Sequence, residues 1–454
     1  SRKYPHIMQR IEVESFGPLK NIDLEIKDYM VFIGPQASGK STLAELIYFF
    51  WKVEDKFNQE ILSTYVLNKI LNTHREEVNY IENWKKFIRK LFSDIFPTYR
   101  NGVIRFTYKD NYHITFNVVS LTEKFNDDVI ISEGFKSDIN EVDRRINASP
   151  ALSRLLREKK FPVEDLLEVF SREFLLNGYQ NNQNIALKRI FIPAGRGILG
   201  LFANSLALVD SNILDYFNSD FVGFANEVRK FIKSGRYEEH FGWTARLTSE
   251  NNGSIYSLGN QISFDILKGD FHTDNKGDGI MHYYNGSGYV IPLKHTSSGQ
   301  QESIWLINVI QYLLINPDEN KYDVIIEEPE AHLYPDAQRD ITNLITLSSN
   351  HTKGRFIVTT HSPYILATLN NSIKAFNVAR EGKADEVEAI LSKELWIDSK
   401  NLFVGFMEKV SNNDSYGIED IFDSELGLIK HEVLDQVSDD IMNQFDELLN
   451  IQYN

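Results

Sequence analysis

The sequence predicts an α/β fold whose sheet is assembled from both ends of the chain around a phosphate-binding loop. The segment Gly34 to Thr42, Gly-Pro-Gln-Ala-Ser-Gly-Lys-Ser-Thr, fits the pattern G-x-x-x-x-G-K-[ST]. The run Tyr29 to Ile33 before it suits a buried strand, and Leu43 to Phe50 after it reads as the start of a helix. Helix and strand patterns alternate again from Ser303 onward. Strand, glycine-rich turn and helix is the geometry that such a loop requires.

The composition narrows the class of protein. The chain has 454 residues, of which 42% are hydrophobic, so it can form a large core with two or three structural units. It has no cysteine, which excludes disulfides and thiolate metal sites, and this fits a reducing compartment such as the cytoplasm. The net charge of −16 argues against nucleic-acid binding over the whole surface, although it leaves room for a local basic groove. The longest apolar run, Ile304 to Ile315, is too short and too polar to span a bilayer, so no membrane partner is expected.

The first half of the chain divides into a core lobe and an insertion. Alternating apolar residues predict two half-buried strands, at 11–16 and 21–26, that lead into the phosphate loop. Helical patterns then run from about 43 to 96 and return before about 188, and a predicted hairpin at 103–119 lies between them. We therefore expect an N-terminal lobe at 1–50 and a mostly helical insertion with one hairpin at 51–188.

The second half is expected to complete the core at 189–410. A short strand at 189–193 comes first, and a helical pattern follows at 204–233. Residues 245–294 alternate and contain Gly, Asn and Asp turns, which predicts antiparallel β structure. The segment 411–454 is acidic, and from Glu419 to Glu447 it keeps the apolar spacing of a helix, with Val433, Val437 and Ile441 on one face. This pattern predicts a docked C-terminal amphipathic helix.

The phosphate loop predicts ATP and Mg²⁺ as cofactors. Backbone N–H groups of the loop and of the following helix terminus point at one spot and stabilise an anion there. Lys40 would reach the β- and γ-phosphates, which makes it a catalytic candidate as well as a binding residue, and the Ser41 hydroxyl would hold Mg²⁺. The residues expected to bind the nucleotide in this loop are Gly34, Pro35, Gln36, Ala37, Ser38, Gly39, Lys40, Ser41 and Thr42.

Two further strands are expected to end in catalytic side chains. The strand that begins at Tyr322 ends in Glu327, which we assign to the metal, and Glu328, which we assign as general base. The alternative is a strand end that merely exposes charge. The strand that begins at Arg355 ends at His361, which could bond a γ-phosphate and report its loss, although a lone histidine is more often structural.

A second anion-binding turn is expected at Ser297, Ser298, Gly299 and Gln300. Two serines and a glycine precede a strongly apolar helix there, and the N–H groups of such a terminus bind anions. An ordinary helix N-cap would have the same pattern.

These motifs, taken in order, resemble the ABC-type ATPases related to SMC proteins and their DNA-repair relatives. Glu-Glu-Pro-Glu-Ala-His-Leu-Tyr-Pro335, Ile192-Pro-Ala-Gly-Arg196 and Thr360-His-Ser-Pro-Tyr-Ile-Leu366 resemble the bacterial OLD-like AAA ATPases more specifically. The likeness covers roughly residues 8–50, 189–200 and 290–370. It implies an ABC-type (SMC-like) P-loop ATPase head, to which the helical insertion and the C-terminal helix are added.

The resemblance also implies a homo-oligomer, at least a dimer. In the family two subunits pack head to tail and trap ATP, so Ser297 to Gln300 would close over the γ-phosphate that Lys40 of the other subunit holds. Ser298 departs from the transporter pattern, which has a glycine there. Gln36 lies in the loop where many relatives have Asn, and the glutamine that senses Mg²⁺ in the family has no secure counterpart.

The biological role is inferred from the same resemblance. OLD nucleases carry a C-terminal Toprim domain, whereas the stretch after His361 is shorter than such a domain and has no Asp-x-Asp. We therefore expect a free-standing ATPase similar to the ATPase subunits of the PARIS and, next, Septu anti-phage systems. Such a subunit senses a phage-encoded trigger protein and holds or releases a separate effector, here a Toprim-type nuclease. The alternative is a DNA-repair or DNA-clamping ATPase.

The insertion is the expected place for the trigger. It contains local basic segments, at 85–90 and from Arg144 to Lys160. Such segments could form a groove for DNA or for an acidic protein, although basic clusters are usually solvated helix faces.

Overall fold

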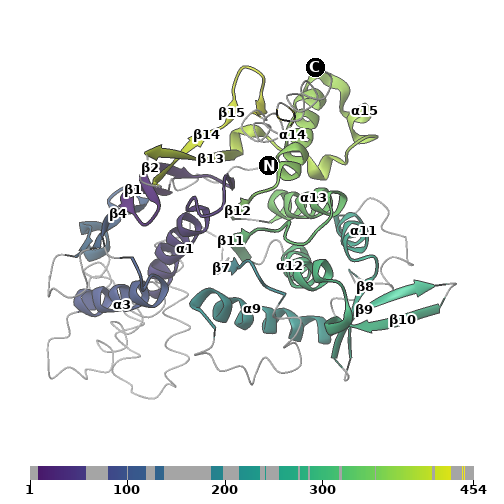
Figure 1. Cartoon of the computed structure of the whole chain (residues 1–454), viewed down its shortest axis with the longest axis horizontal. Coiled ribbons are helices and arrows are strands. Elements are labelled where there is room, and N and C mark those ends of the chain that lie inside the picture. The colour runs from purple at the N-terminus through teal and green to yellow at the C-terminus, as the bar shows by residue number, and fades with distance from the viewer. Residues whose placement is uncertain are drawn as a thin grey trace, which may run out of the picture.

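The fold is a large mixed sheet with helices on both faces (Figure 1). The structure is a computed structural model. It describes residues 9–57, 80–99, 101–118, 128–137, 186–197, 214–235, 241, 255–274, 277–284, 287–315, 320–352, 354–411, 415–430, 442 and 444. Within these residues, no helix is both long and apolar enough to cross a membrane.

The main sheet has eleven strands in the order β6-β5-β4-β1-β2-β14-β13-β3-β12-β11-β7. One half is parallel and consists of β13 (Leu402–Ser411), β3 (Tyr29–Ile33), β12 (Phe356–Thr360), β11 (Asn320–Glu327) and β7 (Ala186–Ile192). In β3 and β12 every residue is buried, as expected for strands covered on both faces. The carboxyl ends of parallel strands lie at one edge, where α/β proteins bind their ligands.

The other half is mostly antiparallel. It contains β14 (Ser415–Asp420), β2 (Leu19–Ile26), β1 (Gln9–Phe16), β4 (Gly102–Lys109), β5 (Tyr112–Val118) and β6 (Val129–Ile131). Buried and exposed residues alternate along β2, because one face of this half packs on a core and the other does not. The two strands expected before the phosphate loop are confirmed as β1 and β2.

The two faces of the sheet bury two separate cores. On one face α1 (Lys40–Lys56) and α3 (Tyr80–Ile95) pack with Met30 and Phe32 of β3. On the other face Val31 and Ile33 pack under α9 (Tyr216–Lys233), α11 (Ile255–Leu267), α12 (Ser298–Ile315), α13 (Pro335–His351) and α14 (Pro363–Val378). The period of two along β3 thus sends alternate side chains to opposite cores.

The remaining elements are short or peripheral. A three-stranded sheet precedes the turn that leads into α12, and short helices and strands follow α14. They are β8 (Asp270–Asp274), β9 (Gly277–Tyr284), β10 (Ser287–Pro292), η4 (Leu293–His295), η5 (Ala379–Lys383), α15 (Ala384–Glu388), η6 (Lys393–Leu395), η7 (Ser399–Asn401), β15 (Phe422–Asp423) and β16 (Leu428–Ile429).

The predicted hairpin at 103–119 forms, but it belongs to the core sheet rather than to a separate insertion. β4 pairs with β1, and the ring of Phe116 of β5 packs at a tilt against that of Phe92 of α3, with ring centroids 4.3 Å apart. These apolar side chains have one face to bury, and the sheet with α1 and α3 provides it. Helix α1 also runs past the expected boundary at 50, and β7 begins at Ala186, where a helical pattern was expected. Residues 58–79, 100, 119–127 and 138–185, which include Arg144 to Lys160, lie outside the described residues.

Two predictions in the second half are wrong in part. Residues 255–267 form α11, not β structure, because Leu258, Ile262 and Ile266 recur at helical spacing and pack beside α12 and α13. The strands on either side of residues 285–286, β9 and β10, do pair antiparallel, as predicted. In the C-terminal segment, residues 415–429 form β14, β15 and β16 where the start of a helix was expected. Ile421 and Ile429 are buried there, and the positions from Val433 to Ile441 lie outside the described residues.

Candidate functional site

The phosphate loop lies between the end of β3 and the start of α1, as predicted. Gly39 precedes the helix in the left-handed region, with φ of 92°. A Cβ at Gly39 would lie 2.6 Å from Leu19 Cδ2, so glycine is required here by both conformation and space. Pro35, Gln36 and Ala37 are exposed at the tip of the loop, whereas Ser38 is buried below it. The tip of the loop is therefore exposed, and its base lies against Leu19 of β2.

Lys40 is folded back onto the loop. Its Nζ donates to the carbonyl oxygens of Gly34, at 2.9 Å, and Pro35, at 2.6 Å. The side chain is almost fully buried, and burial lowers its pKa to about 8, while the charges of Glu328 and Glu330 act in the opposite direction. The ammonium is thus held by neutral carbonyls beside two carboxylates, in a position from which it can turn to a phosphate.

Glu327 and Ser41 meet below the loop. Glu327 ends β11 and is buried, and its Oε2 accepts the N–H of Ala194 at 3.2 Å. Burial raises the pKa of Glu327, and the Ser41 hydroxyl and the Ala194 amide lower it. The other oxygen, Oε1, is buried without a hydrogen-bond partner. An unpaired carboxylate oxygen beside a hydroxyl is a donor set that fits Mg²⁺.

The surroundings of Ser41 and Glu327 also suit a metal ion that takes some of its ligands from a bound nucleotide. Among the described residues, no group of three or more His, Asp or Glu side chains is arranged to hold a metal. Mg²⁺ in phosphate-transfer sites takes one or two protein ligands and completes its shell with phosphates and water. Ser41 and Glu327 are the residues that would hold it.

Glu328 follows Glu327 in a different backbone conformation. Its φ of 40° lies in the left-handed region, which turns the chain out of β11. The carboxylate lies 3.4 Å from His361 Nε2. Hydrogen bonding to His361 lowers the pKa of Glu328, and the charges of His361, Lys40 and Arg196 add to this effect. Glu328 is therefore ionised at neutral pH and can accept a proton.

Sequence reasoning missed Glu330, which fixes the position of His361. The Oε1 of Glu330 accepts the Thr360 hydroxyl and the His361 backbone N–H, both at 2.7 Å. Its Oε2 is buried without a partner. Only its place two residues after Glu328 in a loop could have signalled this role.

A second acid that was not predicted, Glu45, lies one helical turn after Ser41 on α1. Burial raises its pKa to about 7, and the negative charges of Glu327 and Asp215 add to the effect. The metal side of the site is therefore more acidic than the motifs alone indicated.

The turn at Ser297 to Gln300 forms a helix N-cap. The Ser297 N–H and hydroxyl donate to Gln300 Oε1, both at 3.0 Å, and the Gln300 N–H returns to the Ser297 hydroxyl at 3.3 Å. This is a capping box at the start of α12. Ser297 and Ser298 are exposed, while a Cβ at the buried Gly299 would lie 2.7 Å from the carbonyl oxygen of His332. None of the hydrogen bonds made by the described residues joins this turn to the phosphate loop.

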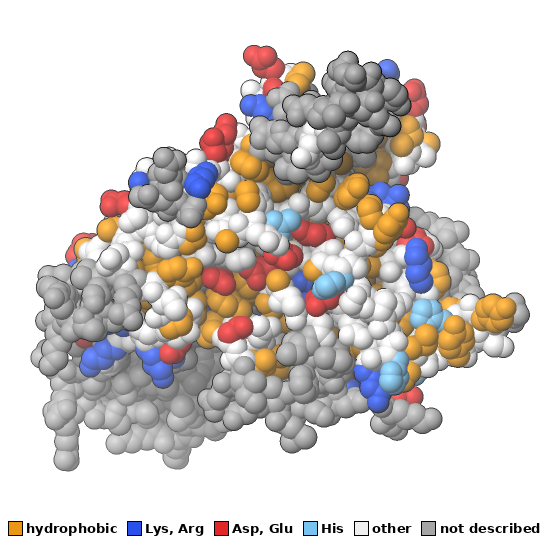
Figure 2. Space-filling model, in the orientation of Figure 1, with side chains coloured by type: hydrophobic (Ala, Val, Ile, Leu, Met, Phe, Trp, Pro, Cys, Tyr) orange, Lys and Arg blue, Asp and Glu red, His pale blue; other side chains and the backbone are white. Residues whose placement is uncertain are grey.

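The surface around the site is acidic. Figure 2 shows Asp and Glu side chains near the middle of one face, over the region where α1 lies beside β11 and β12 in Figure 1. On that face the described Lys and Arg side chains are scattered and form no broad basic surface. This distribution matches the negative net charge of the whole chain.

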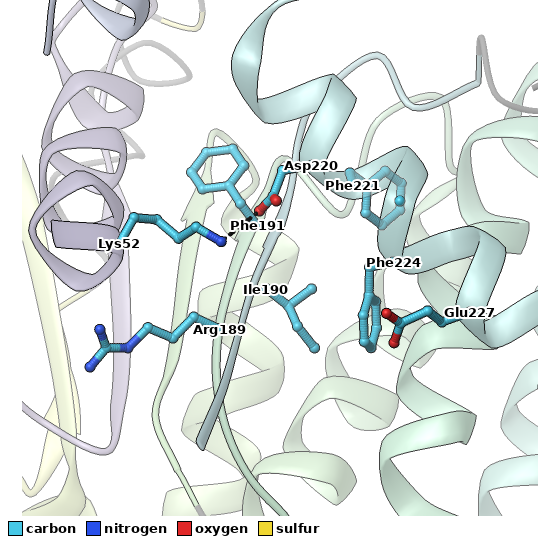
Figure 3. Close-up of a pocket in the computed structure, with 9 residues that line it drawn as sticks. Lys52, Arg189, Ile190, Phe191, Asp220, Phe221, Phe224 and Glu227 are labelled. Atoms are coloured by element: carbon cyan, nitrogen blue, oxygen red, sulfur yellow. Dashed lines mark hydrogen bonds and ion pairs between the residues drawn. The ribbon is translucent and has the colours of Figure 1, made fainter. Parts of the chain in front are cut away.

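A separate cavity of about 260 Å³ lies beside the edge strand β7, between α1 and α9 (Figure 3). The Lys52 ammonium and the Asp220 carboxylate face each other in it at 3.5 Å, and the rings of Phe221 and Phe224 form one wall. Glu227 adds a second carboxylate. Arg189 also lines the cavity, but it is paired with Glu54 and Asp55, as Lys52 is with Asp220. Two acids beside two cations that are already paired disfavour a phosphate, so this cavity is distinct from the nucleotide site.

The fold and the site define an α/β P-loop ATPase, as the sequence predicted. The family model of the AAA ATPase domain matches residues 7–366, and the chain belongs to this family. The family supports nucleotide binding and ATPase activity.

The solved structures that match include SMC head domains. The SMC head bound to the C-terminal winged-helix domain of ScpA is 11% identical with a TM-score of 0.38, covering 93% of this chain and 99% of that one. The SMC head domain of Thermotoga maritima is 11% identical with a TM-score of 0.35, covering 92% and 99%. The Pyrococcus furiosus SMC head with an extended coiled coil, bound to the C-terminal domain of ScpA, is 12% identical with a TM-score of 0.34, covering 96% and 99%. These likenesses are remote and carry no information about substrates or partners.

Proposed function

We propose that this chain binds Mg²⁺ and ATP at the loop of residues 34–42 and hydrolyses the ATP with Glu328 as general base. The observation that carries the proposal is the convergence of Lys40, Ser41, Glu327 and Glu328 at the carboxyl ends of β3 and β11. These residues come from distant parts of the sequence. Their side chains occupy separate positions, in which Glu327 can hold a cation, Glu328 can accept a proton and Lys40 can bind a phosphate.

Each side chain has one step in the reaction. Lys40 exchanges the carbonyls of Gly34 and Pro35 for the β- and γ-phosphates. Ser41 and Glu327 hold Mg²⁺, which neutralises phosphate charge when bound. Glu328, ionised beside His361, accepts the proton of the attacking water, and His361 bonds the γ-phosphate. Glu330 keeps the His361 backbone in place while this occurs.

The first test is Lys40→Ala. Loss of the ammonium leaves the phosphates without their charge partner, so the affinity for Mg²⁺-ATP should fall by about 100-fold or more. Calorimetry with ATP and a slowly hydrolysed analogue measures this affinity, and Lys52→Ala, a lysine of the separate cavity, serves as the matched control. Unchanged affinity in Lys40→Ala would remove the loop from the nucleotide site.

The exposed turn at Ser297 to Gln300 is proposed to act on ATP held by a second copy of the chain. In the single chain the turn makes no hydrogen bond to the phosphate loop, and its two serines face outward. At the start of α12 the Gln300 N–H already donates to the Ser297 hydroxyl, which leaves the N–H groups of Ser298 and Gly299 to point at an anion. A head-to-tail dimer would then complete each site with a helix terminus from the opposite copy.

The biological role that we propose is that of a cytoplasmic defence ATPase, in which ATP-driven closure holds a separate Toprim-type nuclease and a phage-encoded trigger releases it. The motif resemblance supports this role, and the negative charge of the chain and of the face in Figure 2 disfavours broad DNA contact.

The test is co-expression with any nuclease that a neighbouring gene encodes. The tagged chain should retain the nuclease in the presence of ATP, and a chain carrying Lys40→Ala should not. DNA binding is measured in parallel over a salt series. Tight binding to DNA that weakens steeply with salt, with no nuclease retained, would instead support the DNA-clamping alternative.

A further inference from the structure

Arg196 lies in the turn that follows β7 and is fully buried, with 0% exposure. Its guanidinium bonds four carbonyl oxygens. Nη1 donates to Glu327 O at 2.9 Å and to Pro193 O at 3.1 Å, Nη2 donates to Glu328 O at 3.2 Å, and Nε donates to Glu302 O at 2.9 Å. One side chain thus joins the end of β7, the end of β11 and the first turns of α12.

This arrangement differs from that of a structural ion pair. Among the described residues Arg196 has no carboxylate within ion-pair distance, whereas the buried Arg189 in the middle of β7 pairs with Glu54 and Asp55. Burial lowers the pKa of Arg196, and the negative charges of the surrounding glutamates raise it. A buried guanidinium whose N–H groups donate to backbone carbonyls fixes the position of that backbone.

The backbone that Arg196 holds is the one that carries the two acids of the site. Glu328 has a left-handed φ of 40°, a conformation that persists in a non-glycine residue only where its surroundings support it. Arg196 bonds the carbonyl on either side of the Glu328 N–H, while that N–H donates to Thr359 O at 2.9 Å. The direction of the Glu328 carboxylate therefore depends on Arg196.

The fourth bond reaches α12. Glu302 lies in the helix whose N-terminus is the exposed turn of Ser297 to Gln300. A second contact joins the same parts, because Gly299 packs against the carbonyl of His332 in the loop that follows Glu328. A displacement of the α12 terminus is thus transmitted to the catalytic peptide through a rigid, buried group.

We propose that Arg196 is a positioning residue that couples the exposed turn at the start of α12 to the Glu328 carboxylate. A second copy that docks on Ser297 to Gln300 would, through Arg196, set the Glu328 carboxylate in its working position. This inference rests on the proposed function, and it adds a route by which dimer closure controls hydrolysis inside one subunit.

The experiment uses Arg196→Lys, which keeps the charge but cannot reach all four carbonyls, and Arg196→Gln, which keeps amide donors without the charge. In at least one of these variants, folded by circular dichroism, the affinity for ATP should stay within about 3-fold while kcat falls by about 10-fold or more. Arg189→Lys is the matched control for a buried arginine. It should lower Tm and leave kcat per folded molecule unchanged.

A double-mutant cycle separates positioning from general stability. If Arg196 acts through Glu328, adding the Arg196 substitution to Glu328→Gln should not lower the residual kcat further. Additive losses would overturn the proposal, and so would loss of ATP affinity in parallel with kcat, or failure of both Arg196 variants to fold. If the unaltered chain has no turnover at all, the proposed function fails, whereas turnover with additive losses removes only the coupling role.

Discussion

At the scale of single residues, short motifs predicted the residues of the nucleotide site, but they did not predict the residues that hold the backbone of the site in place. The loop from Gly34 to Thr42 and the pair Glu327 and Glu328 stand out because their residue types and spacing fit the binding of a phosphate and Mg²⁺ and the acceptance of a proton. The structure brings Lys40 near Glu328 and Ser41 near Glu327, as a single nucleotide site requires. The catalytic roles themselves stay predictions.

The prediction at this scale is Glu328→Gln. The amide keeps the size of the side chain but cannot accept the water proton, so kcat should fall by about 100-fold or more while ATP remains bound. Single-turnover kinetics with radiolabelled ATP measures the chemical step. Glu330→Gln is the comparison, because it leaves the base intact and weakens the support of His361, and its loss of kcat should be smaller. Normal turnover in Glu328→Gln would show that another group takes the proton.

Glu330 and Arg196 could not be assigned from sequence for a physical reason. Their roles consist of bonds to the backbone of segments that are distant in the chain, such as Glu330 to His361 N–H and Arg196 to Glu327 O. A backbone acceptor leaves no mark in the residue types, so no motif spacing reveals the pairing. Carboxylates that bind a cation are visible in a sequence, but carboxylates that bind a backbone are not.

At the scale of elements, periodicity predicted strands better than it predicted boundaries. The strands around the phosphate loop carry continuous apolar runs, which have few other interpretations. Residues 255–267 were misread because polar Asn260, Gln261 and Ser263 lie between the apolar positions and imitate alternation. In the folded chain Asn260 and Ser263 are buried among helices, and tertiary packing decides in favour of the helix.

The junction of α1 with β7 contains a buried cluster of charges. Arg189 Nη1 lies 3.0 Å from Asp55, and Arg189 also bonds Glu54 and the carbonyl of Trp51. Asp323 lies behind it, with Oδ2 3.4 Å from Arg355. Burial raises the pKa of Asp55 from 3.8 to about 6, although Arg189 opposes the shift. One arginine faces more than one acid here, so the acids are not all fully compensated.

The prediction at this scale follows from the raised pKa of Asp55. The folded state favours its protonated form, so this contribution to stability is complete below pH 3.8 and is lost as the pH rises through about 6. Asp55→Asn cannot titrate. The Tm of this variant relative to the unaltered chain should therefore increase between pH 4 and pH 7. Thermal unfolding over a pH series measures this, and a constant difference would contradict the assignment.

At the scale of the whole molecule, the expected sheet from both chain ends is confirmed, but the hairpin assigned to an insertion belongs to it as well. Strand order depends on pairings between distant segments. The sequence does not show whether β1 pairs only with β2 or pairs with β4 on its other edge as well. The rings of Phe49, Phe92 and Phe116 pack together and bind the hairpin, α1 and α3 into one core. Sequence alone does not rank such long-range contacts.

The prediction at this scale concerns two copies of the chain. Ser298→Arg places a bulky cation on the exposed turn, so it should raise the dimer dissociation constant by about 10-fold or more and leave ATP binding by one subunit within about 3-fold. Analytical ultracentrifugation in the Glu328→Gln background with ATP measures dimer formation. Ser424→Arg, an exposed serine in the turn between β15 and β16, is the control. Equal loss of both properties in Ser298→Arg would argue against the contact between copies.

The neighbours of β3 in the sheet have a consequence for synthesis of the chain. The strand that carries the phosphate loop is hydrogen-bonded on one side to β12 and on the other to β13, and both are made more than three hundred residues later. A nascent chain on the ribosome therefore contains the phosphate loop long before the strands that flank β3 have been made. The apolar β3 lacks one or both of its neighbouring strands until translation has passed Ser411. During that interval its unpaired edges and apolar side chains are of the kind that makes partly folded chains prone to aggregate.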